Sequence, residues 1–271
     1  MSGLEELFSV KGKVALVTGG ATGIGRMCAT GLAMGGARVL IASRKAGACA
    51  ETAGEINALG LPGTVEGFGG DVGTEEGVDA LAAEVKARTD RLDILVNNAG
   101  LSWGEPYETF PYKAWARVMD VNVTGLFHLT RQLTGLLDAA ASDEDPARII
   151  NLGSVMGTQP IADGAYSYTA SKAAVHHLTR TLAIEFAERR ITVNAFAPGP
   201  FQSKMTAFAT AGDENAKRIG ARVPLGRIGA PSDIAGATLF LCSKAGAYVT
   251  GCILPLDGGQ SVQHGMSLFK D

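Results

Sequence analysis

Short apolar runs rich in β-branched residues alternate with longer amphipathic segments from one end of the sequence to the other. Most of the short runs are continuously apolar rather than alternating, which is typical of parallel strands buried on both faces. The pattern predicts strands over residues 13–18, 38–42, 64–68, 93–97, 148–152, 192–196 and 252–256. It predicts helices over residues 24–34, 47–59, 75–88, 112–137, 168–187 and 232–242.

Seven strands with intervening helices predict an α/β fold, a doubly wound, seven-stranded parallel sheet of the Rossmann type with right-handed crossovers. The sequence has no internal repeat and no change in composition that would mark a boundary, so residues 1–271 are expected to form a single domain. The polar, acidic segment 141–146 ends in proline and is interpreted as a surface loop between a helix and a strand.

Composition excludes several classes of protein. Glycine accounts for 36 of the 271 residues, about twice the usual share of roughly 7%. A hydrophobic content of 46% and a net charge of −3 exclude a disordered chain, and the scattered cations do not predict nucleic-acid binding. No apolar run is long enough for a membrane span, and Glu5 and Glu6 stand where a signal peptide would be basic. A soluble cytoplasmic protein is expected.

The first predicted strand ends in a glycine-rich turn that opens a helix. The segment Thr18–Gly25 has the sequence TGGATGIG, with glycine at positions 19, 20, 23 and 25. Such a turn lets the backbone approach a pyrophosphate, which then lies on the helix N-terminus. This context predicts a dinucleotide site that includes Gly19, Thr22, Gly23, Ile24 and Gly25.

The end of the second strand favours NADP(H) as the cofactor, with NAD(H) as the alternative. An NAD site would place a carboxylate there for the ribose 2′-hydroxyl. The sequence instead has Ser43, Arg44 and Lys45, and a guanidinium is a good partner for a 2′-phosphate. Asp71 and Val72, after the third strand, are expected beside the adenine. Asn98, Ala99 and Gly100, after the fourth strand, are expected beside the ribose.

These motifs, taken in order, resemble those of the short-chain dehydrogenase/reductase family over about the whole chain. The shared pattern comprises TGGATGIG, the Asp71-Val72 pair, NNAG at 97–100, Asn122, Ser154, Tyr168-x-x-x-Lys172 and Pro198-Gly199. Within the family, the stretches 94–104, 146–154 and 245–251 are most similar to bacterial 3-oxoacyl-[acyl-carrier-protein] (β-ketoacyl) reductases linked to rhamnolipid synthesis. Pro198 and Gly199 are expected at the edge of the cofactor. Ser203 occupies the place of the threonine that usually follows this pair.

The predicted catalytic residues are Asn122, Ser154, Tyr168 and Lys172. Tyr168 and Lys172 are four positions apart on a predicted helix and therefore share a face. The Lys172 ammonium is expected to lower the phenol pKa, so that Tyr168 can exchange a proton with a ketone or alcohol oxygen. Ser154 ends the fifth strand and would polarise that oxygen. By family resemblance, Lys172 would also bind the nicotinamide ribose, and Asn122 would hold a water that relays protons to Lys172.

Residues 200–222 are predicted to form an apolar substrate lid, because Phe201, Met205 and Phe208 can offer an apolar face. This favours reduction of a hydrophobic ketone such as a 3-oxoacyl thioester, with acyl carrier protein as a possible partner. The alternatives are a dehydrogenase that oxidises a sterol, sugar or aromatic secondary alcohol, and a nucleotide-sensing protein that has lost turnover.

The resemblance also implies a homotetramer, with helices 112–137 and 168–187 pairing across a dyad. Four apolar residues at helical spacing, Val175, Leu178, Leu182 and Phe186, could lie in that interface or could equally face the sheet of their own subunit. No metal site is expected, because the histidines do not have the spacing of metal ligands; they are His128, His176, His177 and His264.

Overall fold

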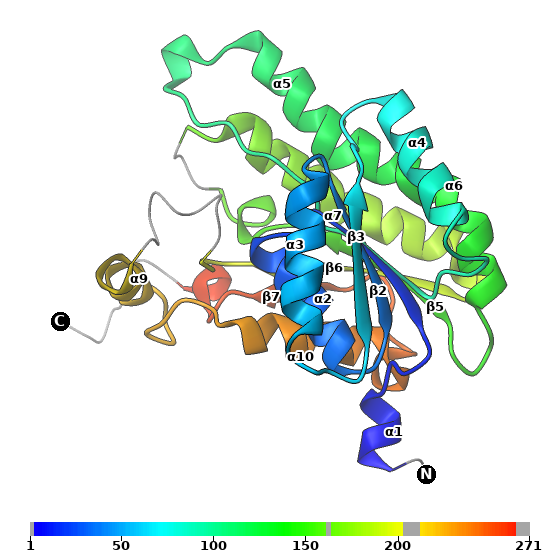
Figure 1. Ribbon diagram of the computed structural model, residues 1–271. Helices are drawn as coiled ribbons and strands as arrows, with labels where there is room; N and C mark the ends of the chain where they lie inside the picture. The colour runs from blue at the N-terminus through cyan, green and yellow to red at the C-terminus, as the bar shows by residue number, and fades with distance from the viewer. Residues whose placement is uncertain (1–2, 161–163, 203–211, 264–271) are drawn as a thin grey trace.

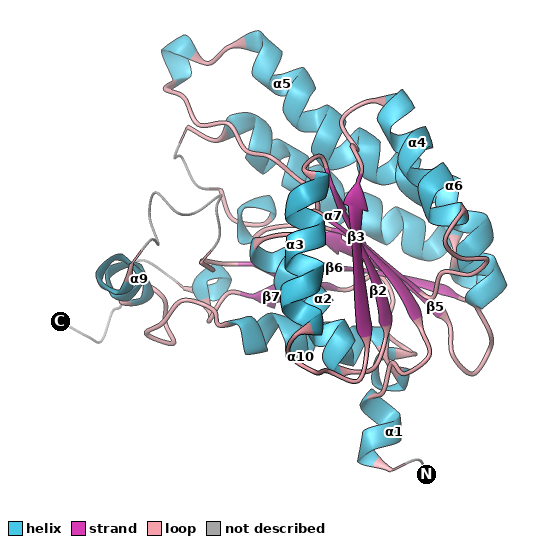
Figure 2. Ribbon diagram, in the orientation of Figure 1, coloured by secondary structure: helices cyan, strands magenta, loops and turns pink. Residues whose placement is uncertain are grey.

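The predicted strands are present and form one parallel sheet. The computed structural model describes residues 3–160, 164–202 and 212–263. The strands are β1 (Val14–Thr18), β2 (Arg38–Ser43), β3 (Thr64–Gly69), β4 (Ile94–Asn97), β5 (Ala147–Leu152), β6 (Ile191–Pro198) and β7 (Ile253–Leu256). Their order is β3-β2-β1-β4-β5-β6-β7, and every neighbouring pair is parallel. Figure 2 shows the strands together in one twisted sheet. The prediction of a single-domain, doubly wound α/β fold is confirmed.

Helices cover both faces of the sheet (Figure 1). One hydrophobic core joins the sheet to α2 (Gly23–Met34), α3 (Ala46–Asn57) and α10 (Pro231–Cys242). The opposite core joins it to α4 (Glu75–Lys86), α6 (Gly125–Ala140) and α7 (Tyr166–Glu185). β1, β4, β5 and β6 are buried along their whole length, although β5 and β6 also contain polar residues such as Arg148 and Asn194. No helix in the described part of the chain is long and apolar enough to cross a membrane.

The prediction of one helix over 112–137 is wrong. The segment consists of α5 (Tyr112–Met119), a π-helical turn η2 (Asp120–Thr124) and α6. Gly125 follows the π turn and packs so tightly on the backbone of Val72 that a Cβ atom there would clash with the Val72 carbonyl oxygen. The wider turn therefore accompanies a close backbone approach, and such turns are frequent at functional sites.

Other boundaries differ from the predicted ones by one or two residues, and two short α-helices among the described residues were not predicted. α7 begins at Tyr166 and ends at Glu185, instead of spanning 168–187. α1 (Leu4–Phe8) precedes the first strand, and α9 (Asp213–Gly220) lies in the segment 200–222 that was predicted to be an irregular lid. The only buried residue of α9 is Gly220, so the helix has no apolar stripe from which it could have been predicted.

The apolar set on α7 faces its own subunit. Val175, Leu182 and Phe186 are buried, and Leu178 packs against the core on the same side of the sheet. Of the two placements considered from the sequence, the structure supports the one on the parent sheet. These residues therefore provide no support for an interface between subunits.

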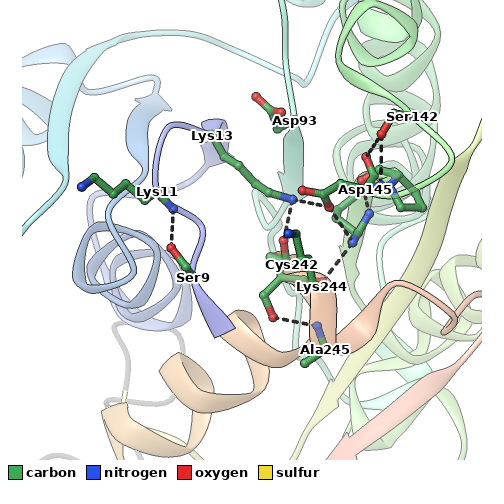
Figure 3. A network of polar contacts seen from close by, with 12 residues as sticks. Ser9, Lys11, Lys13, Asp93, Ser142, Asp145, Cys242, Lys244 and Ala245 are labelled. Atoms are coloured by element: carbon green, nitrogen blue, oxygen red, sulfur yellow. Dashed lines mark hydrogen bonds and ion pairs between the residues drawn. The ribbon is translucent and has the colours of Figure 1, made fainter. Parts of the chain in front are cut away.

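A network of buried charges joins the amino-terminal ends of β1 and β5 to the end of α10. Lys13 donates to Asp145 at 2.6 Å and to the carbonyl oxygen of Cys242 at 3.3 Å (Figure 3). Arg148 has no exposed surface and donates to Asp145 at 3.1 Å and to the Ser243 carbonyl oxygen at 2.9 Å. The segment 141–146 is thus more than the surface loop that was predicted, because Asp145 points into this network.

Candidate active site

The predicted cofactor residues and Ser154 follow the carboxyl ends of the parallel strands, whereas Tyr168 and Lys172 lie on α7. The chain passes from β1 to β2 and β3 on one side of the sheet, and later from β4 to β5, β6 and β7 on the other. The strand order therefore reverses between β1 and β4, and ligands of open α/β sheets bind in the crevice at such a point. The turns after β1 and β4 meet there, and those after β2, β3, β5 and β6 extend the site to either side.

The turn between β1 and α2 has the geometry of a pyrophosphate cradle. Gly19 and Gly23 have φ angles of +66° and +54°, which favour glycine, and α2 begins at Gly23. A Cβ atom at Gly25 would lie 2.4 Å from the Gly19 carbonyl oxygen, so this close approach also requires glycine. The N-cap residue Thr22 makes no side-chain capping hydrogen bond, so the helix N-terminus can accept an anion. The residues therefore fit a dinucleotide.

Asn98 braces this turn. Its Nδ2 donates to the carbonyl oxygens of Thr18 at 2.8 Å and Gly19 at 3.1 Å. The Thr18 hydroxyl accepts from the backbone amides of Asn98 and Ala99, both at 3.0 Å. The sequence analysis placed Asn98 beside the ribose and did not identify Thr18, because a threonine that ends a strand is indistinguishable from an ordinary strand former.

A cavity of about 390 Å³ lies at the carboxyl ends of β2 and β3, where the adenosine end was predicted. Arg44 and Asp71 line it, as do Val121 and two cations of α5, Lys113 and Arg117. In the described part of the chain, Arg44, Lys113 and Arg117 form no ion pair. Two carboxylates, Asp71 and Asp120, line the same cavity, so the three cations leave an excess of positive charge for an anion. The sequence analysis missed the two α5 cations, because only the fold brings α5 opposite the end of β2.

Ser154 and Tyr168 meet through their hydroxyl groups. Ser154 follows β5 as the N-cap of the short 3₁₀ helix η3 (Val155–Gly157), and its Oγ accepts from the Met156 amide at 3.2 Å. It also hydrogen-bonds the Tyr168 phenol, which lowers the pKa of that group, but burial has the larger effect and raises the phenol pKa above its usual value. The structure thus brings the predicted pair together.

Lys172 lies beside Tyr168, as their spacing predicted. Its Nζ is 5.5 Å from the centre of the Tyr168 ring and donates to the Leu152 carbonyl oxygen at 2.5 Å. Burial lowers the pKa of Lys172 to about 8. The Lys172 charge was expected to lower the pKa of Tyr168. For the protein alone this expectation is wrong, because the pKa of the phenol is set by burial, which raises it, and by the hydrogen bond to Ser154, which lowers it.

Asn122 lies in the π turn and its amide is engaged by the protein. Its Oδ1 accepts from the Leu101 amide at 2.9 Å, and its Nδ2 donates to the Leu101 carbonyl oxygen at 3.0 Å and to Ser171 Oγ at 2.9 Å. Ser171 in turn donates to the Tyr168 carbonyl oxygen at 2.7 Å. Asn122 therefore ties the turn after β4 to the first turns of α7. A Cβ atom at Gly100 would be 3.2 Å from its Oδ1.

A second, mainly apolar cavity lies at the carboxyl ends of β6 and β7. Pro198 ends β6, and the Gly199 amide donates to the Leu256 carbonyl oxygen at 3.0 Å. The cavity is about 450 Å³ and is lined by Phe201, Pro224 and Leu225 among others. Ser203, Met205 and Phe208, which the sequence analysis assigned to the cofactor site and the lid, lie outside the described residues.

The remaining candidates lie elsewhere. Tyr166 packs edge-on against Phe110, with ring centres 5.3 Å apart. His128 is near Glu75 and Asp79 on α4, with one ligand atom of each within 4.8 Å of the others, although both acids are exposed. His264 lies outside the described residues.

Comparison with known proteins agrees with this geometry. Residues 19–261 match the family model described as enoyl-(acyl carrier protein) reductase. The rhamnolipids biosynthesis 3-oxoacyl-[acyl-carrier-protein] reductase of Pseudomonas aeruginosa is 45% identical over 252 residues, which are 93% of this chain and 97% of that protein. A galactitol 2-dehydrogenase (L-tagatose-forming) of Cereibacter sphaeroides is 39% identical over 259 residues, covering 94% of this chain and 98% of that protein.

A similar solved structure is the Pseudomonas aeruginosa RhlG/NADP active-site complex. It superposes with a TM-score of 0.90 at 44% sequence identity, covering 94% of this chain and 99% of that chain. The similarity therefore extends over nearly the whole fold.

Proposed function

The chain belongs to the short-chain dehydrogenase/reductase family of oxidoreductases, and we propose that it reduces a hydrophobic ketone to a secondary alcohol with NADP(H). The observation that carries the proposal is the contact between the Ser154 and Tyr168 hydroxyl groups, with the buried Lys172 beside them. This arrangement lies next to a glycine turn that fits a dinucleotide. NAD(H) is the alternative cofactor.

Tyr168 is the proton donor in this mechanism. When bound, the nicotinamide supplies the hydride that reaches the ketone carbon. Burial raises the pKa of the phenol, so Tyr168 is protonated at neutral pH and can give its proton to the oxygen that becomes the alcohol. Ser154 donates a hydrogen bond to the same oxygen and polarises the carbonyl group. In the reverse direction the same groups accept the proton from an alcohol.

Other residues would hold the cofactor. Gly19, Thr22, Gly23, Ile24 and Gly25 would bind the pyrophosphate at the N-terminus of α2. Lys172 would donate to the nicotinamide ribose, with Pro198, Gly199 and Ser203 at the edge of the cofactor. On the adenosine side, the residues that would take part are Ser43, Arg44, Asp71, Val72, Asn98, Ala99 and Gly100.

We predict that Arg44→Ala weakens NADPH binding about 10–100-fold and changes NADH binding little, because a charge-assisted hydrogen bond to a phosphate contributes about 1.5–3 kcal/mol. Titration of nicotinamide fluorescence with both cofactors measures this. Lys45→Ala is the matched control, since Lys45 is the next residue, is also exposed and does not line the cavity. An equal loss for NADPH and NADH would contradict the assignment of Arg44 to the 2′-phosphate.

We predict that kcat/KM for NADPH falls as the pH rises through about 8. The pKa of Lys172 is lowered to about 8 by burial, and only the ammonium form, present below that pH, donates to the ribose with its full charge. Tyr168 does not contribute to this fall, because its pKa is raised. Steady-state rates from about pH 6 to pH 10 provide the test. Lys172→Arg keeps its charge and should shift the fall to higher pH, whereas a flat wild-type profile would contradict the prediction.

The proposed substrate is a 3-oxoacyl thioester, with its acyl chain carried by an acyl carrier protein or a smaller thiol. The apolar cavity beside Phe201 and Leu225 supports a hydrophobic substrate, and residues 200–222 are proposed as the lid. The Pseudomonas aeruginosa relative is named for the same reaction. A panel of 3-oxoacyl thioesters, polyols and sterols, followed by nicotinamide absorbance in both directions, tests this choice.

The second candidate function is oxidation of a sugar, sterol or aromatic secondary alcohol. The galactitol 2-dehydrogenase relative favours it, because the same proton-transfer residues work in both directions. Faster turnover of polyols with an oxidised cofactor than of thioesters with NADPH would select it. A protein that bound NADPH but turned over no member of the panel would instead be a nucleotide sensor.

A cytoplasmic homotetramer is the proposed assembly. Several large apolar side chains are exposed on α5, α6 and α7, where a second copy could cover them; they are Tyr112, Trp115, Phe127 and Ile184. Light scattering of the purified protein measures the number of subunits directly.

A further inference from the structure

The loop that carries Ser154 is built around the ring of His176. His176 lies on α7, one turn after Lys172, and is only 5% exposed. Its Nε2 accepts from the Ser154 backbone amide at 3.4 Å, and its Nδ1 lies 3.4 Å from Thr158 Oγ1. The ring therefore touches the loop both at the proposed catalytic serine and four residues later.

Two glycines make this fit possible. A Cβ atom at Gly153 would lie 2.2 Å from His176 Nε2, and one at Gly157 would lie 2.8 Å from Cε1. Real Cβ atoms essentially never approach so closely, so the loop closes around the ring only because both positions lack a side chain. The ring thus fills a place shaped by the backbone on both sides of Ser154.

The ring is neutral over the physiological range of pH. Burial, which has the largest effect, and the positive charges of Arg180 and Lys172 together lower the pKa of His176 to about 4. A neutral imidazole has one acceptor nitrogen and one donor nitrogen. Nε2 accepts from the Ser154 amide, so Nδ1 carries the proton and donates to Thr158.

We propose that His176 is a positioning residue that acts through Ser154, holding the serine backbone where its hydroxyl meets the Tyr168 phenol and the substrate oxygen. The predicted effect on catalysis rests on the proposed function. The contact between Ser154 and Tyr168 can be measured without turnover. Small displacements of a catalytic group are costly: about 1 Å can reduce the rate by about 10²-fold.

The first test is a double-mutant cycle with His176→Leu and Ser154→Ala. His176→Leu should lower kcat about 10–100-fold in the wild-type background and little or not at all once Ser154 is alanine. His177→Leu is the matched control, because His177 is the next residue and is exposed; it should leave kcat within about twofold. Losses that multiply in the double variant would show a general structural role and overturn the proposal.

The second test does not need a substrate. Since the Ser154 hydrogen bond lowers the pKa of Tyr168, losing it should raise that pKa. NMR titration of ¹³C-labelled tyrosine, with the Tyr168 signal assigned from Tyr168→Phe, should show a rise in His176→Leu similar to that in Ser154→Ala, and none in His177→Leu. An unchanged Tyr168 titration in His176→Leu would overturn the proposal, whatever the enzyme reduces.

His176→Gln keeps the test decisive if the leucine variant does not fold. The glutamine amide oxygen can accept from the Ser154 amide, so this variant should recover part of kcat and a Tyr168 titration near that of the wild type. If His176→Gln folds but recovers neither kcat nor the wild-type titration of Tyr168, His176 does not act through the serine backbone.

Discussion

Tyr168→Phe should abolish most ketone reduction while leaving NADPH binding within about threefold of the wild type. The substitution keeps the aromatic ring and removes the hydroxyl that bonds Ser154. Well-placed acid–base catalysis contributes about 10²–10⁴-fold, so kcat should fall by at least that factor. Single-turnover absorbance measures the chemical step, and fluorescence titration measures NADPH binding.

Tyr166→Phe is the control for this variant. Tyr166 is two residues away on the same helix, but it packs against Phe110 and Tyr107, and the residue four positions later is Ala170. Loss of its hydroxyl should therefore leave most of the turnover. Full activity in Tyr168→Phe would refute the assigned proton donor, and equal losses in both variants would indicate a packing effect.

The sheet could be predicted from the sequence because a strand buried on both faces has a short, mostly apolar sequence that can be recognised locally. β1 is apolar up to its final threonine and β5 is mostly apolar, as buried parallel strands are, and each is followed by turn residues at the edge of the sheet where ligands bind. The motif residues Ser154, Tyr168 and Lys172 could then be placed together, because the parallel topology fixes which turns meet.

The rest of the site depends on contacts that no local pattern records. The π turn at Asn122 accompanies the approach of Gly125 to the backbone of Val72, which is distant in sequence. His176 was set aside as one of several histidines without metal-ligand spacing, since its role is visible only when the Ser154 loop folds over it. The raised pKa of Tyr168 is caused mainly by burial. The spacing of Tyr168 and Lys172 in the sequence does not indicate how deeply the phenol is buried.

Asp145→Asn should lower the free energy of unfolding by about 3 kcal/mol. The substitution keeps the shape of the side chain and removes the charge that Lys13 and Arg148 share. Burial lowers the pKa of both cations, so each is costly to keep charged. The charge of Arg148 lowers the pKa of Lys13 further, and the Asp145 carboxylate opposes the lowering of both. The loss is expected at the lower end of the range for a broken buried pair, because Asp145 is 29% exposed and Asp93 remains near both cations.

Asp143→Asn is the matched control in the same loop. Its carboxylate pairs with Arg190, but its side chain is 74% exposed, and such pairs contribute about 0–1 kcal/mol. Urea denaturation at one fixed protein concentration compares the two variants, with an unchanged m-value as the sign that only stability has changed. Equal losses would contradict the prediction. kcat should be unaffected in both, because the network lies at the end of the sheet opposite to the catalytic residues.

The same physics predicts that removing all three charges costs less than removing one. Lys13→Met, Asp145→Leu and Arg148→Met together eliminate the need to bury charge, and apolar replacement of a whole buried network is often neutral or stabilising. The carbonyl oxygens of Leu241, Cys242 and Ser243 would then lose their donors, which limits the recovery. A triple variant more stable than Asp145→Asn would show that the acid is retained to balance two buried cations, whereas a less stable one would show that the bonds to these carbonyl groups dominate.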